Sequence, residues 1–301
     1  MELSVVVPTL NGRDRLAATL DALTAEAPEA EVVVVNGPSA DGTTGMVRDR
    51  DDVATLVEVS ERNVNVARNA GLAAATGEAV AVVGDDHHVV DGWASAVRSA
   101  VDGGARVVTG PCRREVRGGA TSESPERTDL GDREVTYFHG DNVVFDAATV
   151  DRLDGFDEYL QTGGARDAAH RLAGLGVTVT WEPAAATVTR VEAVDGGREQ
   201  RDWRWRYRAL AYRLVKNYGF RPTALWPLLR HAVVDAGEAG AGVLRGEGSP
   251  TEWFGNGRDV LVGLSTGISH GLVARAKDRS SARNPNGLSG RRDRAVAVHR
   301  E

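Results

Sequence analysis

The chain has 301 residues, of which 42% are hydrophobic, so it can bury the core of one large domain or of one domain with a smaller appendage. Its formal net charge of -7 excludes a global basic surface of the kind that binds nucleic acid. Cys112 is the only cysteine, which excludes an internal disulfide and fits a reducing cytoplasm. The opening MELSVVVPTL reads as a strand without a basic segment or a long apolar stretch, so we expect no signal peptide.

Short valine-rich runs alternate with helical patterns through residues 1–110. Between the first two runs, Leu16, Leu20 and Leu23 recur at helical spacing. Short apolar runs separated by helices are typical of βαβ units around a parallel sheet that is buried on both faces. The sequence therefore predicts an α/β fold with strands at 4–7, 32–35, 55–59, 80–83 and 105–109.

Polar residues follow three of these strands. In parallel sheets, ligands bind outside the carboxyl ends of the strands, so we expect a polar and partly acidic crevice there. The residues at that edge are Pro8, Thr9, Leu10, Asn11, Asn36, Gly37, Gly84, Asp85 and Asp86.

Four motifs, in this order, resemble the family 2 glycosyltransferases, which have a GT-A fold. The motifs are SVVVPTLNGRDRL, EVVVVNGPSADGT, RNVNVARNAGLAAATGEAVAVVGDD and GDNVVFDAATVDRLDGFDEYLQTGGARDAAHRLAGLGVTVTWEP, and they cover residues 3–190. The resemblance implies a Rossmann-like, mostly parallel sheet flanked by helices. It also implies an inverting transfer from a nucleotide-sugar donor of the UDP or GDP type.

The resemblance also sets the expected domain organisation. Residues 1–197 form the predicted catalytic domain, with a nucleotide-sugar half at 1–110 and an acceptor half at 136–197. The composition then changes to arginine and aromatic residues, and we expect a helical, membrane-associated extension at 198–275. The last stretch, 276–301, is too polar to bury much surface and is predicted to be a flexible tail.

A sugar nucleotide carries two adjacent phosphates, and a divalent cation held by carboxylates neutralises them and stabilises the leaving diphosphate. The resemblance implies Mg²⁺ or Mn²⁺ at the GDD segment, with Asp86 as the first metal ligand and Asp85 as the second. The alternative is a turn whose aspartates accept backbone hydrogen bonds. The family more often has another aspartate at the position of Gly84. His87 and His88 either supply an imidazole ligand or flank the turn, and we favour the second interpretation.

The resemblance places further donor contacts at the ends of the first, second and fourth predicted strands and at Arg68 in the segment ARNAG. Asn36 stands where the family usually has an aspartate, so its amide offers hydrogen bonds without charge. Arg68 resembles the family's arginine near the nucleotide, and the alternative for it is a helix-surface charge. Arg190 is a candidate positive charge for the diphosphate. The donor-binding set is Pro8, Thr9, Asn11, Asn36, Asp41, Arg68 and Asp85, and the acceptor-side set is Gly140, Asp141 and Asn142.

The usual catalytic base is missing. An inverting transfer to a hydroxyl needs a group that takes the proton, and the family supplies it from a Glu-Asp pair that here is Gly164-Ala165. One alternative is that Asp167 is the base, tuned by His170 one helical turn away. A second is a lipid phosphate acceptor, whose oxygen is already ionised. A third is a binding protein without catalysis. Asp167 also fits a structural charge near a helix N-terminus.

The segment 201–221 interleaves arginine and aromatic residues, which suits an anionic lipid surface or a helix docked by its apolar face. On this pattern Trp203, Tyr207, Leu210 and Leu214 share one face, and Arg201, Trp205, Arg208, Tyr212 and Lys216 share the other. Gly263, Gly267 and Gly271 form a small-residue face that allows close helix packing.

These interpretations predict a metal-dependent inverting glycosyltransferase that builds a lipid-linked or cell-surface glycan, in protein glycosylation or polysaccharide assembly. We expect it in the cytoplasm, peripheral at the inner face of the cell membrane, with no nucleic-acid partner. The alternatives are a polyprenyl-phosphate sugar synthase and a catalytically silent nucleotide-sugar-binding protein.

Overall fold

The computed structural model describes residues 1–114, 124–189, 202–222 and 250–300, and the single positions 226, 230, 234 and 237. The chain folds into two compact units. The first consists of Met1–Thr128, Val135–Val194 and Asn286–Glu301, and the second of Asp129–Glu134 and Asp195–Pro285. The chain therefore leaves the first unit and later returns to it.

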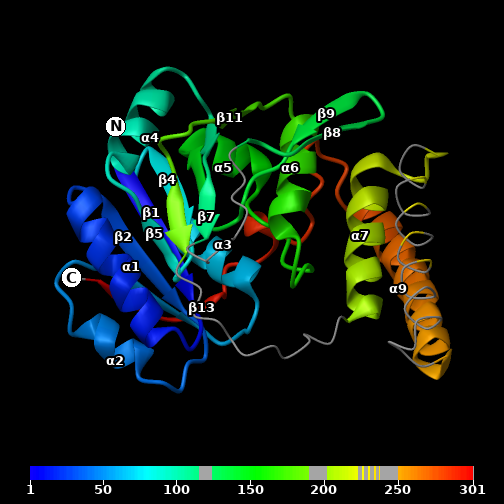
Figure 1. Cartoon of the computed structure of the whole chain (residues 1–301), viewed down its shortest axis with the longest axis horizontal. Coiled ribbons are helices and arrows are strands. Elements are labelled where there is room, and N and C mark those ends of the chain that lie inside the picture. Colours follow the sequence, from blue (N-terminus) through cyan, green and yellow to red (C-terminus); the bar gives the residue numbers. More distant parts are fainter. Residues whose placement is uncertain are drawn as a thin grey trace. The chain divides into compact units, whose positions relative to one another are not determined.

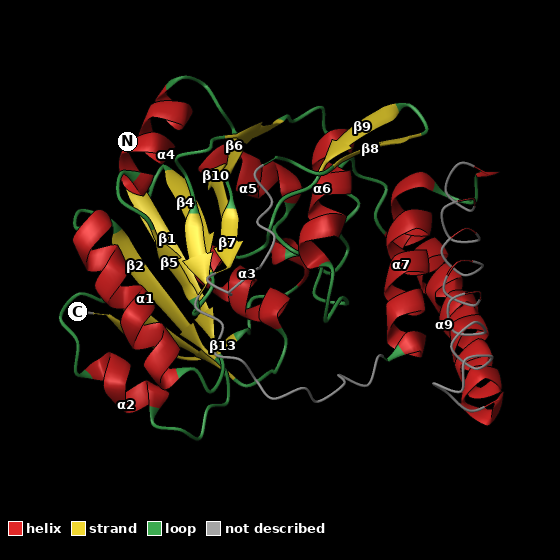
Figure 2. Ribbon diagram, in the orientation of Figure 1, coloured by secondary structure: helices red, strands yellow, loops and turns green. Residues whose placement is uncertain are grey.

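The first unit is built on an eight-stranded sheet in the order β11-β6-β10-β4-β1-β2-β3-β13 (Figures 1 and 2). The strands β1, β2, β3 and β4 run parallel to one another, and β10 and β13 run antiparallel to their neighbours. This mostly parallel sheet with helices confirms the predicted α/β class. Its strands are β1 (Leu3–Thr9), β2 (Glu31–Asn36), β3 (Thr55–Val59), β4 (Ala79–Val83), β6 (Val107–Thr109), β10 (Asn142–Asp146), β11 (Val179–Trp181) and β13 (Ala295–Arg300).

Two smaller sheets accompany the main one. In the first, β12 (Thr187–Thr189) lies between β5 (His87–Val89) and β7 (Cys112–Arg114). In the second, β8 (Arg127–Leu130) pairs with β9 (Arg133–Thr136). The three-stranded sheet matters for the site, because each of its strands carries a residue that lines a cavity.

The alternation of side chains along each strand divides the core into two apolar layers. Val5 and Val7 belong to one layer, with Leu16, Leu20 and Leu23 of α1 (Arg13–Glu26), which confirms the predicted helix. Val6 belongs to the other layer. The first layer also includes α4 (Trp93–Asp102), and the second includes α3 (Val64–Ala74), α5 (Ala147–Leu153) and α6 (Gly164–Gly174). The short α2 (Thr43–Arg48) follows β2.

The second unit contains the predicted helical extension as α7 (Trp203–Tyr218) and α9 (Pro250–Lys277). The glycine stripe lies against α7: a Cβ atom at Gly267 would stand 2.3 Å from the carbonyl oxygen of Arg208. Gly263 and Gly271 approach the α7 backbone in the same way. The stripe therefore allows close packing of the two helices, as the sequence predicts.

The predicted division of α7 into an apolar face and a basic, lipid-facing side needs correction. Tyr212 and Lys216, assigned to the basic side, are both buried. Residues 211–218 are all buried, and α9 packs against this half of the helix through Gly267 and Gly271, so that exposed arginines stand only in the first two turns. In the described part of the chain, every helix is too short or too polar to cross a membrane.

The predicted flexible tail at 276–301 is also corrected. Residues 288–290 form a short 3-10 helix (Leu288–Gly290), and β13 then pairs antiparallel with β3 as the edge strand of the main sheet. Arg294 is buried and donates hydrogen bonds to the carbonyl oxygens of Gly287 (2.6 Å) and Leu288 (3.2 Å), and it pairs with Glu158. Backbone pairing and ion pairs thus order a segment that has few apolar residues to bury.

Candidate active site

A cavity of about 380 Å³ opens at the carboxyl ends of the parallel strands, where the sequence predicts a polar crevice. We call it the donor-side cavity. Carboxylates and arginines lie together in its wall, which is the combination that a cation and an anionic ligand need. Its lining comprises Pro8, Thr9, Leu10, Arg15, Gly37, Glu61, Arg62, Asn63, Val64, Ala67, Gly84, Asp85, Asp86, Asp141 and Gln161.

Asp85 is held firmly in this wall. Its Oδ2 accepts a hydrogen bond from Thr9 Oγ1 at 2.7 Å and lies 3.4 Å from Arg15 Nη2. A Cβ atom at Gly12 would stand 2.2 Å from the same oxygen, so a residue with a side chain there would displace it. Burial raises the pKa of Asp85, and these two partners oppose the rise. The side chain of Asp85 is therefore held by its neighbours and has little surface accessible to a ligand.

Asp86 is more open and lines a second cavity as well. Its Oδ1 lies 2.7 Å from His87 Nδ1, and this hydrogen bond lowers the pKa of Asp86. The side chain keeps 40% of its surface exposed, so the carboxylate is ionised and accessible. Of the two aspartates in the predicted metal motif, Asp86 is the more accessible.

Asp141 approaches the same point from the loop before β10. Arg68, on α3, donates from Nη2 to Asp141 Oδ1 at 2.6 Å. Burial opposes ionisation of Asp141, but Arg68, His139 and His87 together lower its pKa. A Cβ atom at Gly140 would stand 2.7 Å from Arg68 Nη2, so the glycine leaves room for this pair. Arg68 is thus a buried partner of the site, and the helix-surface alternative does not apply.

Asn142, the last residue of this predicted acceptor-side set, has a different place. Its side chain is buried, and Nδ2 donates to the carbonyl oxygens of Ala185 (2.9 Å), Pro111 (3.3 Å) and Gly110 (3.4 Å). It therefore ties β10 to two neighbouring loops, while Asp141 alone of the three presents a charge to the cavity.

A larger cavity of about 800 Å³ adjoins the first and shares Val64, Asp86, Asp141 and Gln161 with it. We call it the acceptor-side cavity. Its wall carries several arginines and histidines, so it is richer in positive charge than the donor-side wall. The rest of its lining comprises Arg68, His87, Gly110, Cys112, Arg114, Ser124, Glu126, Tyr137, Phe138, His139, Gly140, Thr162, Gly163, Gly164, Ala165, Arg166, Trp181 and Thr189.

Three predicted donor residues shape the loop after β2 instead of lining the donor-side cavity. Asn36 is buried, and its amide contacts Ser39 and Thr44. Asn11 adopts a positive φ of 49° and accepts a hydrogen bond from the backbone of residue 40. Asp41 accepts hydrogen bonds from Thr43 Oγ1 and from two backbone N–H groups, which lower its pKa to about 2. Pro8 and Thr9, by contrast, line the cavity.

Asp167 is not placed as a catalytic base. Its side chain has no exposed surface, and its Oδ2 lies 2.8 Å from Arg171 Nε, whose side chain is equally buried. Gly164, Ala165 and Arg166 line the acceptor-side cavity, but Asp167 lies outside the lining of both cavities. The helix turns its side chain into the core, so the structural interpretation replaces the prediction of a base. Arg190 lies outside the described residues.

His87, Cys112 and His139 form a cluster whose ligand atoms all lie within 4.8 Å of one another. The sequence pattern offers His87 as a possible imidazole ligand but gives no signal for Cys112 or His139. Burial favours the neutral thiol of Cys112 and so raises its pKa. Hydrogen bonds with His139 and His87 act in the opposite direction, and the resulting pKa of Cys112 is about 6. Burial also disfavours a charged His87, but Asp86, Cys112 and Asp141 raise its pKa to about 10. The three residues lie far apart in the sequence, and nothing in their spacing connects them.

Comparisons with known proteins agree with this geometry. The model of glycosyl transferase family 2 matches residues 4–152. No curated protein sequence matches the chain.

Three solved structures have a similar fold. The mannosyltransferase PcManGT from Pyrobaculum calidifontis, in complex with GDP-Man and Mn²⁺, is 21% identical over 92% of this chain and 88% of that chain, with a TM-score of 0.55. S. aureus TarS is 18% identical over 72% of this chain and 39% of that chain, with a TM-score of 0.57. Its fragment 1–349 is 18% identical over 72% of this chain and 66% of that chain, with a TM-score of 0.55.

The family match spans β1 to α5, including the strand ends that form the donor-side cavity. The chain belongs to glycosyl transferase family 2 and is a glycosyltransferase with a GT-A fold.

Proposed function

We propose that the protein is a metal-dependent, inverting transferase that moves a sugar from a UDP- or GDP-type nucleotide sugar to a lipid-linked or cell-surface acceptor. The observation that carries the proposal is the meeting of Asp86 and Asp141 at the wall that the two cavities share. A donor held on one side of that wall and an acceptor on the other would meet at these carboxylates.

The donor-side residues fit Mg²⁺ or Mn²⁺, because carboxylate oxygens are the ligands that these ions prefer. Asp86 and Asp141 would hold the ion, and Asp85 would support them from its fixed position in the adjoining turn. When bound, the ion neutralises the diphosphate and stabilises it as a leaving group. A similar fold, that of PcManGT, was solved with GDP-Man and Mn²⁺.

Arginines of the chain would supply further positive charge to the phosphates and hold one of the carboxylates in place. Arg15 and Arg62 line the donor-side cavity and would attract the phosphates. Arg68 fixes Asp141 by its ion pair, so that this carboxylate stays ionised and points towards the shared wall. The loop organised by Asn36 and Asp41 contributes Gly37 to the cavity lining, and we propose that it meets the nucleoside.

A phosphate acceptor is the second candidate, and the burial of Asp167 favours it. The positions where the family carries its base are Gly164 and Ala165, and Asp167 is paired with Arg171 in the core. The acceptor-side wall instead presents Arg114 and Arg166. A polyprenyl phosphate needs no base because its oxygen is already ionised, and arginines bind phosphate well.

We further propose that the enzyme works in the cytoplasm, peripherally at the inner membrane face, where a lipid-linked acceptor is found. The first two turns of α7 support this: Arg204 and Arg206 are exposed, and the guanidinium of Arg206 lies 5.4 Å from the ring centre of Trp203. Arginines beside indole rings suit the headgroup region of an anionic bilayer. The carboxylates and both cavities are intact, so we do not retain the silent-binder alternative.

The proposal is tested by donor binding and transfer. A panel of UDP and GDP sugars is titrated calorimetrically with Mn²⁺ or with a chelator, and one donor should bind only with the metal. Asp86→Ala should abolish that binding, and Asp14→Ala, which removes an exposed aspartate of α1, should leave it unchanged. Equal donor binding by wild type and Asp86→Ala, or full transfer in excess chelator, would refute the metal-dependent proposal.

Transfer is then measured with two acceptors, a polyprenyl phosphate and an oligosaccharide. The anomeric configuration of the product, read by NMR, should be opposite to that of the donor. Retention of configuration would contradict the inverting mechanism, and transfer to the oligosaccharide alone would remove the phosphate candidate.

A further inference from the structure

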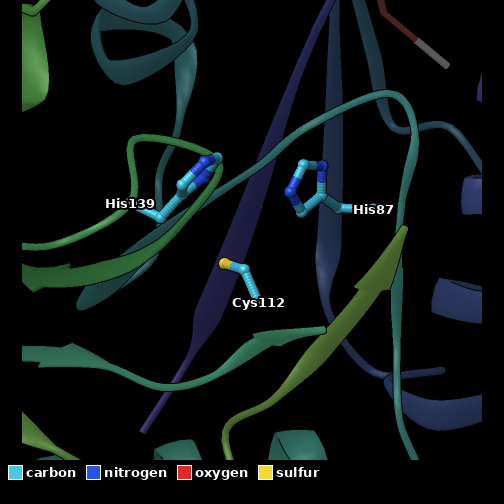
Figure 3. Close-up of side chains that lie close together, drawn as sticks. All are labelled: His87, Cys112 and His139. Atoms are coloured by element: carbon cyan, nitrogen blue, oxygen red, sulfur yellow. The ribbon is translucent and has the colours of Figure 1, made fainter. Parts of the chain in front are cut away.

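The cluster of His87, Cys112 and His139 stands in the wall of the acceptor-side cavity, and it has no part in the function proposed above. Figure 3 shows the two imidazole rings and the sulfur atom turned towards a common space. His87 comes from β5, Cys112 from β7, and His139 from the loop between β9 and β10. Their ligand atoms lie within 4.8 Å of one another, and the two ring centres are 5.2 Å apart.

This set of ligands differs in kind from the carboxylates of the donor side. Thiolate and imidazole are the ligands of Zn²⁺ and related transition metals, whereas Mg²⁺ and Mn²⁺ prefer oxygen. In a tetrahedral zinc site with bonds of about 2.0 to 2.3 Å, neighbouring ligand atoms stand roughly 3.3 to 3.6 Å apart. The cluster would therefore contract by about 1 Å around an ion, which rotation of the half-exposed His139 side chain can supply.

The groups behind the histidines have the positions that orient metal ligands. Asp86 Oδ1 lies 2.7 Å from His87 Nδ1, which leaves Nε2 for the ion. Asp141 Oδ2 lies 3.6 Å from His139 Nδ1. Carboxylates that bond the second ring nitrogen fix the tautomer and raise the basicity of a ligating histidine. Thr187 Oγ1 also lies 3.6 Å from Cys112 Sγ, across the small sheet.

The glycine at 84 fits the same arrangement. A Cβ atom there would stand 2.7 Å from His87 Nδ1 and 2.8 Å from Asp141 Cβ. An aspartate at this position, as the family more often has, would push His87 and Asp141 apart. The departure of this chain from the family pattern thus makes room for one histidine of the cluster and for the carboxylate beside the other.

We propose that His87, Cys112 and His139 bind a Zn²⁺-class ion as three protein ligands, at a site separate from the donor metal. Three protein ligands leave a tetrahedral ion with one further position. All three residues line the acceptor-side cavity, so that position faces the space where we place the acceptor. The ligand chemistry there is an oxygen of the acceptor or of water.

The test uses Co²⁺ as a spectroscopic substitute for zinc. The full-length protein is stripped of metal with a chelator, dialysed, and titrated with Co²⁺ and then with Zn²⁺, in the absence of any sugar nucleotide. We expect one equivalent of Co²⁺ to give an intense near-ultraviolet thiolate-to-metal band and the visible bands of a tetrahedral ion, and Zn²⁺ to displace it. Co²⁺ bound by carboxylates alone would give neither feature.

Cys112→Ser should lose the thiolate band and bind Zn²⁺ at least about 100-fold more weakly, since even residues behind the ligands alter affinity by about 10- to 100-fold. His139→Gln provides a second variant, because its half-exposed side chain can be replaced without disturbing the core. His88→Gln, which changes the neighbouring histidine, should leave the spectrum unchanged.

Absence of the thiolate band in the wild-type protein, or an unaltered Zn²⁺ affinity in both Cys112→Ser and His139→Gln, would overturn the proposal. The titration contains no donor or acceptor. Its outcome is therefore independent of whether the transfer reaction proposed above is correct.

Discussion

Arg68 and Asp141 form an ion pair of 2.6 Å that joins helix α3 to the loop before β10, at the wall between the two cavities. The arginine is buried, and the carboxylate keeps 28% of its side-chain surface exposed. The guanidinium of Arg68 packs over Phe156, 5.2 Å from the ring centre, whereas the carboxylate of Asp141 remains open to ligands.

We expect Arg68→Met to lower the free energy of unfolding by about 1 to 3 kcal/mol, because it removes a charged hydrogen bond and leaves a carboxylate without its partner. The pKa of Asp141 should rise, and metal-dependent donor binding should weaken with it. Urea unfolding and donor titration measure the two effects. Arg106→Met removes an exposed arginine that lines neither cavity and is the control. Equal stability of the two variants would contradict this interpretation of the pair.

Asp167→Asn should affect stability more than catalysis. Removing one charge of a buried pair costs roughly 3 to 5 kcal/mol, because Arg171 is left uncompensated in the core. The transfer rate per folded molecule should stay within tenfold of the wild type, well below the loss of about 100- to 10,000-fold that follows removal of a general base. Urea unfolding and single-turnover transfer are compared with Asp151→Asn, which changes an exposed aspartate of α5. A large rate loss in stable protein would restore Asp167 as the base.

Arg294→Met should destabilise the first unit, although the residue lies in a segment whose composition resembles a linker. The change removes one of the two ion-pair partners of Glu158, the other being Arg291, and the donors to two carbonyl oxygens. A loss of about 3 kcal/mol would lower Tm by about 6 to 12 °C in a unit of this size. Scanning calorimetry measures the shift, with the exposed Arg292 replaced by Met as the control. Matching Tm values would mean that β13 contributes little to the fold.

Replacing Arg204 and Arg206 by Glu should weaken binding to anionic liposomes by at least about thirtyfold, at about 1 kcal/mol for each basic residue near the surface. The binding should also fall with salt, because exposed charges are screened within about 8 Å at physiological ionic strength. Flotation is compared with a variant carrying Glu at Lys277 and Arg279, which makes the same charge change at the end of α9. Similar flotation of the two variants would exclude α7 as the membrane contact. Truncation before α7 is unsuitable because it also removes β13.

The local pattern of valine-rich runs in the sequence predicts most strands of the main sheet. The valine runs that become β1, β2, β3 and β4 are short and continuous because both faces of the sheet are covered, and flanking residues mark their ends. Leu16, Leu20 and Leu23 likewise reveal the buried face of α1. The carboxylates at the end of β4 were found for the same reason: a chemical signal directly follows a clear strand.

The failures have a different physical origin. Whether the side chain of Asp167 points into a cavity or into the core depends on the rotation of α6, which its sequence spacing does not determine. His87, Cys112 and His139 are brought together only by pairing of strands distant in sequence. The alternating AVAVHR of β13 does carry a strand signal, but the polar residues around it obscured that signal.

The place of β13 affects how the first unit can fold during synthesis. Its partner β3 is made about 240 residues earlier, and the whole of α7 and α9 is translated between the two strands. Until β13 leaves the ribosome, the edge of β3 presents unpaired backbone groups, which are prone to pair with other chains. The emerging chain therefore has an unpaired edge strand until β13 has been made, and the pairing of β13 with β3 is a long-range step that comes late relative to the synthesis of β3. Chaperones that shield exposed strands should contact β3 until β13 is free to pair with it.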